Sequence, residues 1–188
     1  MTWVVAVLTS EFFWGVIVGL VLAAIGAWLQ AVLTARQFQK AQKNQIKNLC
    51  IDTINNIKAI VDDMADHRQK SNVIHSDYLS LLDIEFNVSG RNRENIIHLP
   101  NPLRDNVRKF ITDCAIRRGE IGGYLAQFSN SMTLANQLQT QGQAFQTQRQ
   151  QAQAQAQAQL ALANQALNQL ATRVKDSADL VNNLKQVR

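Results

Sequence analysis

Proline and glycine are scarce in this chain, whose 188 residues include two prolines and eight glycines. Proteins built from many short strands need frequent turns, and turns favour these two residues, so the scarcity disfavours a turn-rich β architecture. Long helices, which proline and glycine interrupt, fit the composition better. The length allows one domain, or one domain with an appendage. We therefore predict an all-α fold.

Cysteine is equally rare, and its two positions carry no recognisable chemistry. Cys50 and Cys114 are too few for a disulfide scaffold and match neither a CxxC zinc pattern nor a haem attachment site. Both fall on apolar helical stripes without a basic neighbour placed to lower the thiol pKa. We expect two inert core thiols.

Catalytic and cofactor motifs are missing from the sequence. It contains no phosphate-binding loop, no dinucleotide-binding glycine turn, no nucleophile elbow and no HExxH helix. Asp63 and His67 are one helical turn apart, beside Asp62 and Asp66, but a solvated acidic turn is the ordinary interpretation of such a cluster. We expect no enzyme activity, no cofactor and no metal.

Charged residues make up only 18% of the chain, against a typical share of about 25%. The net charge of +5 hints at an anionic partner. However, the basic region between residues 89 and 118 has no aromatic platform. Its Asp105 and Lys109, like its Asp113 and Arg117, are spaced as i,i+4 pairs of a solvated helix. Nucleic acid is therefore an unlikely partner.

One long stretch, from Phe12 to Ala35, has no charged residue and is mostly apolar. At a rise of about 1.5 Å per residue, a helix of this length crosses a hydrocarbon core of about 30 Å. A cleaved signal peptide is the alternative, but it needs a basic segment, and residues 1–11 contain neither lysine nor arginine. We predict a transmembrane helix over residues 12–35.

Four basic residues follow this helix at spacings of four, three and four, which place them on one helical face: Arg36, Lys40, Lys43 and Lys47. Positive residues near a span stay on the cytoplasmic side. The stripe therefore predicts an extracytoplasmic N-terminus, residues 1–11, and a cytoplasmic remainder at a bacterial inner (plasma) membrane. We expect the stripe to contact anionic lipid head groups. Lys47 lies farthest from the span, and for this residue a solvated side chain is the simpler interpretation.

Small residues recur every fourth position within the predicted span: Gly15, Gly19, Ala23 and Ala27. This spacing lets a second helix approach closely, so it predicts self-association within the membrane. A plain anchor whose glycines contact lipid is the alternative.

The rest of the chain divides by pattern into a helical bundle over residues 36–135 and an arm over 136–188. Apolar periodicity predicts bundle helices over about 36–69, 72–87 and 102–135. Residues 89–93 are expected to form a loop. Gly119, Gly122 and Gly123 suggest a bend in the third helix, since glycine weakens a helix interior.

The arm is rich in glutamine and alanine, and residues 121–172 contain one formal charge, Arg149. The near-alternating repeat over residues 148–159 favours helix by propensity, with a flexible linker as the alternative. Heptad spacing then predicts a coiled-coil seam at Leu160, Leu167, Leu170, Val174, Val181 and Leu184. The same frame extends back to Leu125, which indicates either one long coiled coil or two helices that share a frame by chance.

Together these features predict a membrane-anchored helical scaffold or tether. Its expected partners are membrane lipids, further copies of itself in a homo-oligomer, and an unidentified cytoplasmic protein. The competing hypothesis is an envelope-spanning or lysis-type coiled-coil tether whose C-terminal domain lies outside the cytoplasm.

Overall fold

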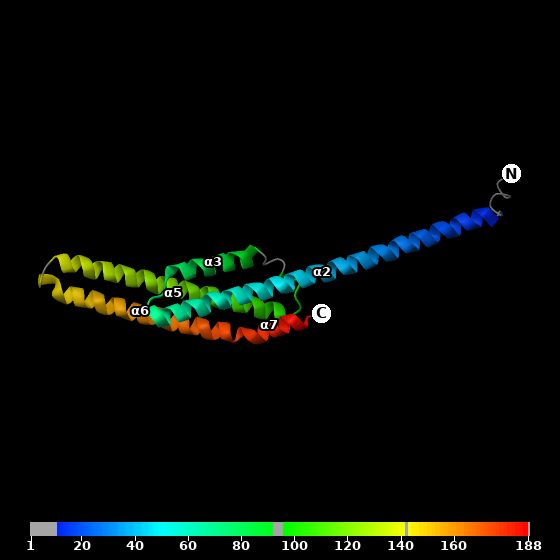
Figure 1. Cartoon of the computed structure of the whole chain (residues 1–188). Helices are drawn as coiled ribbons and strands as arrows, with labels where there is room; N and C mark the ends of the chain where they lie inside the picture. Colours follow the sequence, from blue (N-terminus) through cyan, green and yellow to red (C-terminus); the bar gives the residue numbers. More distant parts are fainter. Residues whose placement is uncertain (1–10, 92–95, 142, 188) are drawn as a thin grey trace. The chain divides into compact units, whose positions relative to one another are not determined.

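The computed structural model describes residues 11–91, 96–141 and 143–187, and it confirms the all-α prediction. About 92% of it is helical, and those residues form no strand. In chain order the elements are α2 (Glu11–Ser71), α3 (Ser76–Arg91), α5 (Leu103–Thr140), the 3-10 turn η1 (Gln143–Phe145), α6 (Gln146–Lys175) and α7 (Ser177–Gln186) (Figure 1).

Two compact units make up the chain: an N-terminal unit, Met1–Gln45, and a packed unit, Ile46–Arg188. Helix α2 contributes to both, because its chain is helical from Glu11 through Ser71. The expected extracytoplasmic segment lies almost wholly outside the described residues, as do residues 92–93 of the expected loop, and the exposure of Gly15 is not described. Helix α3 extends through Arg91, where that loop was expected to have begun.

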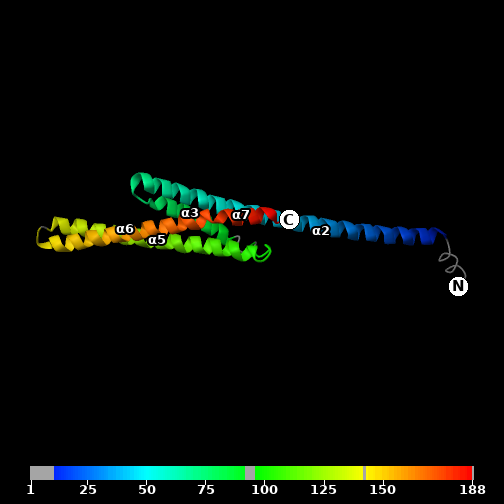
Figure 2. The same cartoon turned by 90° about the horizontal axis from the view of Figure 1, so that it is seen from below.

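In the packed unit, the second part of α2 is amphipathic. Its buried side chains recur every three or four residues: Ile46, Cys50, Ile54, Ile57, Val61 and Met64. The helix ends where Asn72 takes a positive φ of 55°, a left-handed conformation that asparagine tolerates better than most residues. Its backbone N–H donates to the carbonyl of Arg68 at 2.8 Å, and α3 then returns alongside α2 (Figure 2).

One hydrophobic core joins α2 to the other helices of the packed unit. Buried apolar residues from the later elements complete it: Leu79 and Leu82 of α3, Val107, Phe110, Cys114 and Ile121 of α5, and Leu167, Leu170, Val174, Val181 and Leu184 of α6 and α7. Each large side chain fully removed from water contributes about 1.5–3 kcal/mol, so this shared core is the main source of stability.

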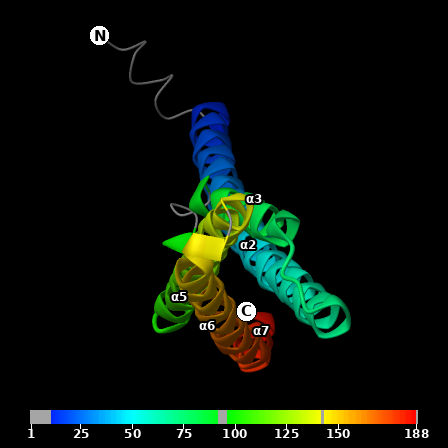
Figure 3. The ribbon, with the colours of Figure 1, turned by 90° about the vertical axis from the view of Figure 1, so that its left-hand side faces the viewer.

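Helices α5 and α6 form an antiparallel hairpin. Helix α5 runs through residue 136, where the sequence analysis began the arm, and ends at Thr140. The chain reverses and α6 begins at Gln146, as the end-on view onto this turn shows (Figure 3). The heptad frame from Leu125 to Leu184 is therefore shared by two facing helices and does not continue along one rod. Arg173 of α6 pairs with Asp113 of α5 at 3.1 Å.

The glutamine/alanine repeat is helical, as its propensities predicted. Because the helical period is 3.6 residues, strict alternation distributes the alanines over opposite faces. Ala152 and Ala156, four residues apart, are buried, whereas Ala154 and Ala158 are exposed. On α5 the buried residues of this part of the hairpin are Ser131 and Ala135. The outer part of the hairpin therefore buries only small side chains.

The three glycines of α5 lie within one unbroken helix. A Cβ at Gly122 would stand 3.3 Å from Nη1 of Arg118 and 3.8 Å from Cδ1 of Leu79, whereas Gly119 and Gly123 have nothing within 4 Å. A Cβ at Gly122 would therefore crowd the end of the Arg118 side chain, which pairs with Asp83 of α3, whereas its contact with Leu79 of α3 would be an ordinary van der Waals one. The bend expected at these glycines stays a prediction.

Candidate membrane and interaction surfaces

The first candidate surface is the apolar part of α2. Within the described residues, α2 is the one helix long and apolar enough to cross a membrane. Its most apolar 18-residue window has a mean hydropathy of 2.1, and none of that window is buried. Large side chains stand in the open, including Leu20 at 66% and Trp28 at 65% exposure. In water such a surface would carry a large hydrophobic cost, which lipid or a partner helix would remove.

The small-residue face of the same helix is open where it is described. Gly19, Ala23 and Ala27 are exposed, and a Cβ at Gly19 would meet no atom within 4 Å. Each step of four residues turns the position by about 40°, so the face winds gradually around the helix. Gly26, seven residues after Gly19, returns to nearly the same direction. The sequence analysis missed this glycine because it followed only the spacing of four.

The basic stripe is divided between the two units. Arg36 and Lys40 are exposed in the N-terminal unit, where Lys43 is half-buried. Lys47 belongs to the packed unit, and its Nζ donates to the backbone carbonyl of Val187 at 3.4 Å. Lys47 is therefore already engaged with the far end of the chain, which favours the earlier view that it is not primarily a lipid contact.

The predicted seam residues lie inside the packed unit. Leu167, Leu170, Val174, Val181 and Leu184 are buried in the shared core, and Leu160 is half-buried. These side chains pack against the protein's own helices. They are consequently not presented to a partner, and any partner must contact other surfaces of the chain.

The cysteines and histidines show no arrangement for chemistry. Burial raises the pKa of the Cys50 thiol to about 11 and that of the Cys114 thiol to about 12, so both stay protonated at neutral pH. The His67 and His75 rings meet edge to face with centroids 4.6 Å apart. Residues 11–91, 96–141 and 143–187 contain no group of three or more His, Cys, Asp or Glu side chains that could hold a metal ion.

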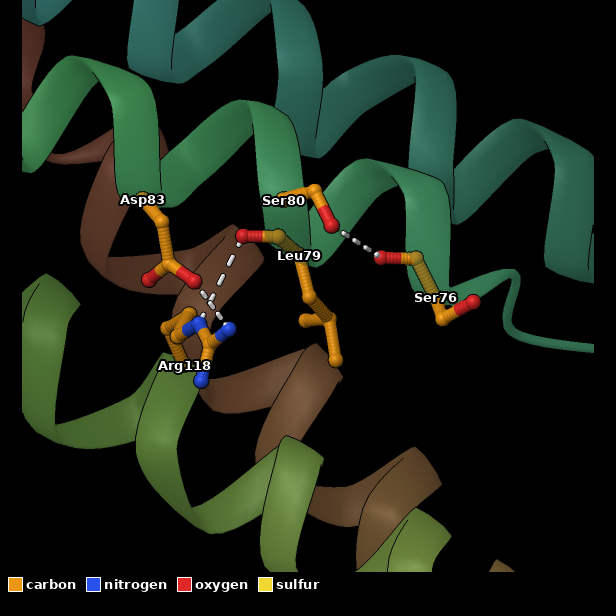
Figure 4. Close-up of polar contacts among 5 residues, drawn as sticks. All are labelled: Ser76, Leu79, Ser80, Asp83 and Arg118. Atoms are coloured by element: carbon orange, nitrogen blue, oxygen red, sulfur yellow. Dashed lines mark hydrogen bonds and ion pairs between the residues drawn. The ribbon is translucent and has the colours of Figure 1, made fainter.

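Polar contacts fasten α5 to its neighbours. Arg118 forms an ion pair with Asp83 of α3, and its Nε donates to the carbonyl of Leu79 at 3.5 Å (Figure 4). On the other side, the Arg173 guanidinium lies 5.9 Å from the Phe110 ring centroid, in cation–π range. These partners are 35 to 63 residues apart in sequence, so periodicity could not have revealed them.

A cleft of about 560 Å³ lies between α5 and α6. The residues that line it are mostly of polar type and include Asp113, Arg117 and Arg173. Each of these three charges already has a partner, since Asp113 pairs with Arg173 and Arg117 pairs with Glu120 at 2.7 Å. Asp176, which also lines the cleft, has no ion pair among the described residues.

Comparison with known proteins adds no relative: no protein-family model matches the chain, and neither a curated protein nor a solved structure matches it.

Proposed function

We propose that this protein is a single-pass inner-membrane scaffold or tether, with its N-terminus outside and its packed unit in the cytoplasm. One observation carries the proposal: the most apolar window of α2 has no buried residue, whereas the same helix is amphipathic where it enters the core of the packed unit. Arg36, Lys40 and Lys43 fall between these two stretches, and Lys47 lies at the start of the second. That order is typical of a membrane anchor continuous with a cytoplasmic domain.

The proposed mechanism is local concentration. Anchoring confines the packed unit to a surface, so weak contacts with further copies or with a cytoplasmic protein partner gain effective concentration. Arg36 and Lys40 would add attraction to anionic lipids, worth about 1 kcal/mol per residue close to the surface. Self-association would use the Gly19, Ala23 and Ala27 face, where a neighbouring helix can approach closely.

The topology is testable with reporters fused after Arg188. The contact between Lys47 and Val187 keeps the C-terminal end beside the start of the packed unit, so a reporter there shares its side of the membrane. We expect a fluorescent protein to fluoresce and alkaline phosphatase to be inactive. Phosphatase activity would instead favour the envelope-spanning or lysis-type tether.

A cleaved signal sequence is distinguished by mass. We expect the membrane-bound chain to retain residues 1–35, and a mature form lacking them would overturn the anchor. The control is the same reporter fusion without residues 12–35. We expect it to be absent from the membrane fraction, because the packed unit by itself should not attach to the membrane.

Self-association in the membrane has a closely matched pair of variants. Ala23→Ile and Ala24→Ile add the same side chain at adjacent exposed positions, but only Ala23 belongs to the small-residue face. We expect Ala23→Ile to reduce dimer crosslinking several-fold in membranes and Ala24→Ile to leave it unchanged, because only the first blocks close helix approach. Equal yields for both variants would remove this face from the proposal.

A further inference from the structure

An apolar groove lies between α3 and α5, on the packed unit. It has a volume of about 440 Å³. Its lining is mostly apolar or small, with one charged residue and one hydroxyl: Phe86, Gly90, Ile96, Arg108, Ile111, Thr112, Ala115 and Ile116. Ile116 is 53% exposed, so the groove opens to solvent at this edge.

Arg108 differs from every other arginine of α5. Arg104 pairs with Asp105, Arg117 with Glu120, and Arg118 with Asp83. Within the described residues, Arg108 has no ion pair or hydrogen bond, and its Nε is buried without a partner. A buried donor on a charged group is costly when it is left unsatisfied, and native structures rarely leave one so. Among the described residues that line the groove, this positive charge has no negative partner.

We propose that this groove binds a single-chain carboxylate amphiphile, of the chemical class of a medium-chain fatty acid anion. The two Nη groups of the guanidinium form a fork of donors that matches the two oxygens of a carboxylate. Thr112, one helical turn beyond Arg108 on the same wall, adds a hydroxyl near the head group. The isoleucine and phenylalanine side chains then cover the hydrocarbon chain. This proposal is independent of the membrane anchor.

The size of the groove selects this occupant over a partner helix. Small-ligand sites typically measure about 300–1,000 Å³, are mostly apolar, and contain a few polar groups that orient the ligand. The groove has all three properties. A partner helix is about 10 Å across with its side chains, so it would lie over the groove without filling it.

Calorimetric titration of the full chain, held in amphipathic polymer without free detergent, tests the proposal with decanoate as the probe. We expect decanoate to bind, 1-decanol to bind about tenfold more weakly, and acetate not to bind, because recognition needs both the charge and the chain. Polymer without protein supplies the background. Equal affinity for decanoate and decanol, or no binding of decanoate, would overturn the proposal.

Two matched variants test whether the Arg108 guanidinium binds the carboxylate of decanoate. Arg108→Met keeps the length of the side chain and removes the guanidinium, and we expect it to weaken decanoate binding about tenfold and to abolish the preference over decanol. Arg104→Met, one turn earlier and already paired with Asp105, should leave the affinity unchanged. Unchanged decanoate affinity in Arg108→Met would contradict the assignment.

Folding and a protein occupant are checked separately. Circular dichroism should show that Arg108→Met is folded, since the change removes an unpaired, half-buried charge. If this variant does not fold, the relative affinities of the unmodified chain for decanoate and decanol still test the proposal. Sedimentation of the unmodified chain and of Arg108→Met tests for a protein occupant. If Arg108→Met changes the sedimenting mass but not the affinity for decanoate, the groove binds a protein segment and the proposal is overturned.

Discussion

The inner and outer parts of the α5–α6 hairpin use the same helices but are stabilised differently. The inner part packs large side chains, such as Phe110, Ile121 and Leu170, into the core shared with α2 and α3. The outer part buries Ser131, Ala135, Ala152 and Ala156, which lie outside that core. Because burial contributes about 0.8 kcal/mol per CH₂ group, the outer part gains little from packing and depends on helix propensity and close helix approach.

Electrostatics follows the same division. The ion pairs of Arg118 with Asp83 and of Arg173 with Asp113 both lie at the inner part. Residues 121–172, a stretch that includes the whole outer part, have one formal charge, Arg149. Stability is therefore expected to be uneven along the hairpin, with local opening at its outer end preceding global unfolding.

The largest expected effect is in the inner core. Leu170→Ala removes a fully buried side chain, so it should lower the free energy of unfolding by about 2–5 kcal/mol. Leu162→Ala, on the same helix but 39% exposed, should cost less than about 1 kcal/mol. Urea denaturation followed by circular dichroism measures both. Similar losses would mean that the inner core is not where stability is concentrated.

A smaller effect distinguishes the two faces of the glutamine/alanine repeat. Ala156→Leu places a large side chain where the helices are in close contact, at a cost of about 1–3 kcal/mol, whereas Ala154→Leu adds it to the exposed face and should be nearly neutral. Hydrogen exchange should quicken over residues 146–160 in the first variant only. The same exchange rates in both variants would contradict the packing of this repeat.

Alkaline pH tests the core through its cysteines. Their folded pKa values, about 11 and about 12, lie above the ordinary thiol value of 9.0, so the folded state holds protons that the unfolded state releases. Stability should be constant with respect to these groups below pH 9 and fall as the pH rises from 9 toward 11–12. By pH 10 the loss is at most about 1.4 kcal/mol per thiol.

The Cys50→Ala, Cys114→Ala double variant is the control, and it should show a flatter decline above pH 9. An unchanged slope in denaturation midpoints would show that other groups cause the alkaline loss. Iodoacetamide should label neither thiol in the folded chain at pH 8, because both are buried and protonated.

The smallest effects concern the glycines of α5. Gly119→Ala and Gly123→Ala should each raise the free energy of unfolding by up to about 1 kcal/mol, because open positions gain helix propensity without a contact. Gly122→Ala should gain less, since its Cβ meets Arg118 at 3.3 Å. Thermal denaturation would rank the three, and an equal gain at Gly122 would show that the Arg118 side chain moves aside without cost.

Local patterns anticipated the helices and much of the core. The low proline and glycine content predicted long helices, and the apolar periodicity of α2 and α6 marked side chains, such as Ile57 and Leu167, that are buried. The turn after Thr140 was harder to place, because the heptad frame is the same on both sides of it. A frame records which face of a helix is apolar, but it does not record where the chain reverses.

The sequence by itself determined the helical class, the apolar stretch of α2 and the neutral outer hairpin, because composition and short-range periodicity act within a few turns of the chain. Only the tertiary structure decided that Lys47 meets Val187, that Arg118 pairs with Asp83 of α3, and that Arg108 borders an apolar groove without a described partner. These features depend on which distant helices lie side by side, and that is settled by how the apolar faces share one core.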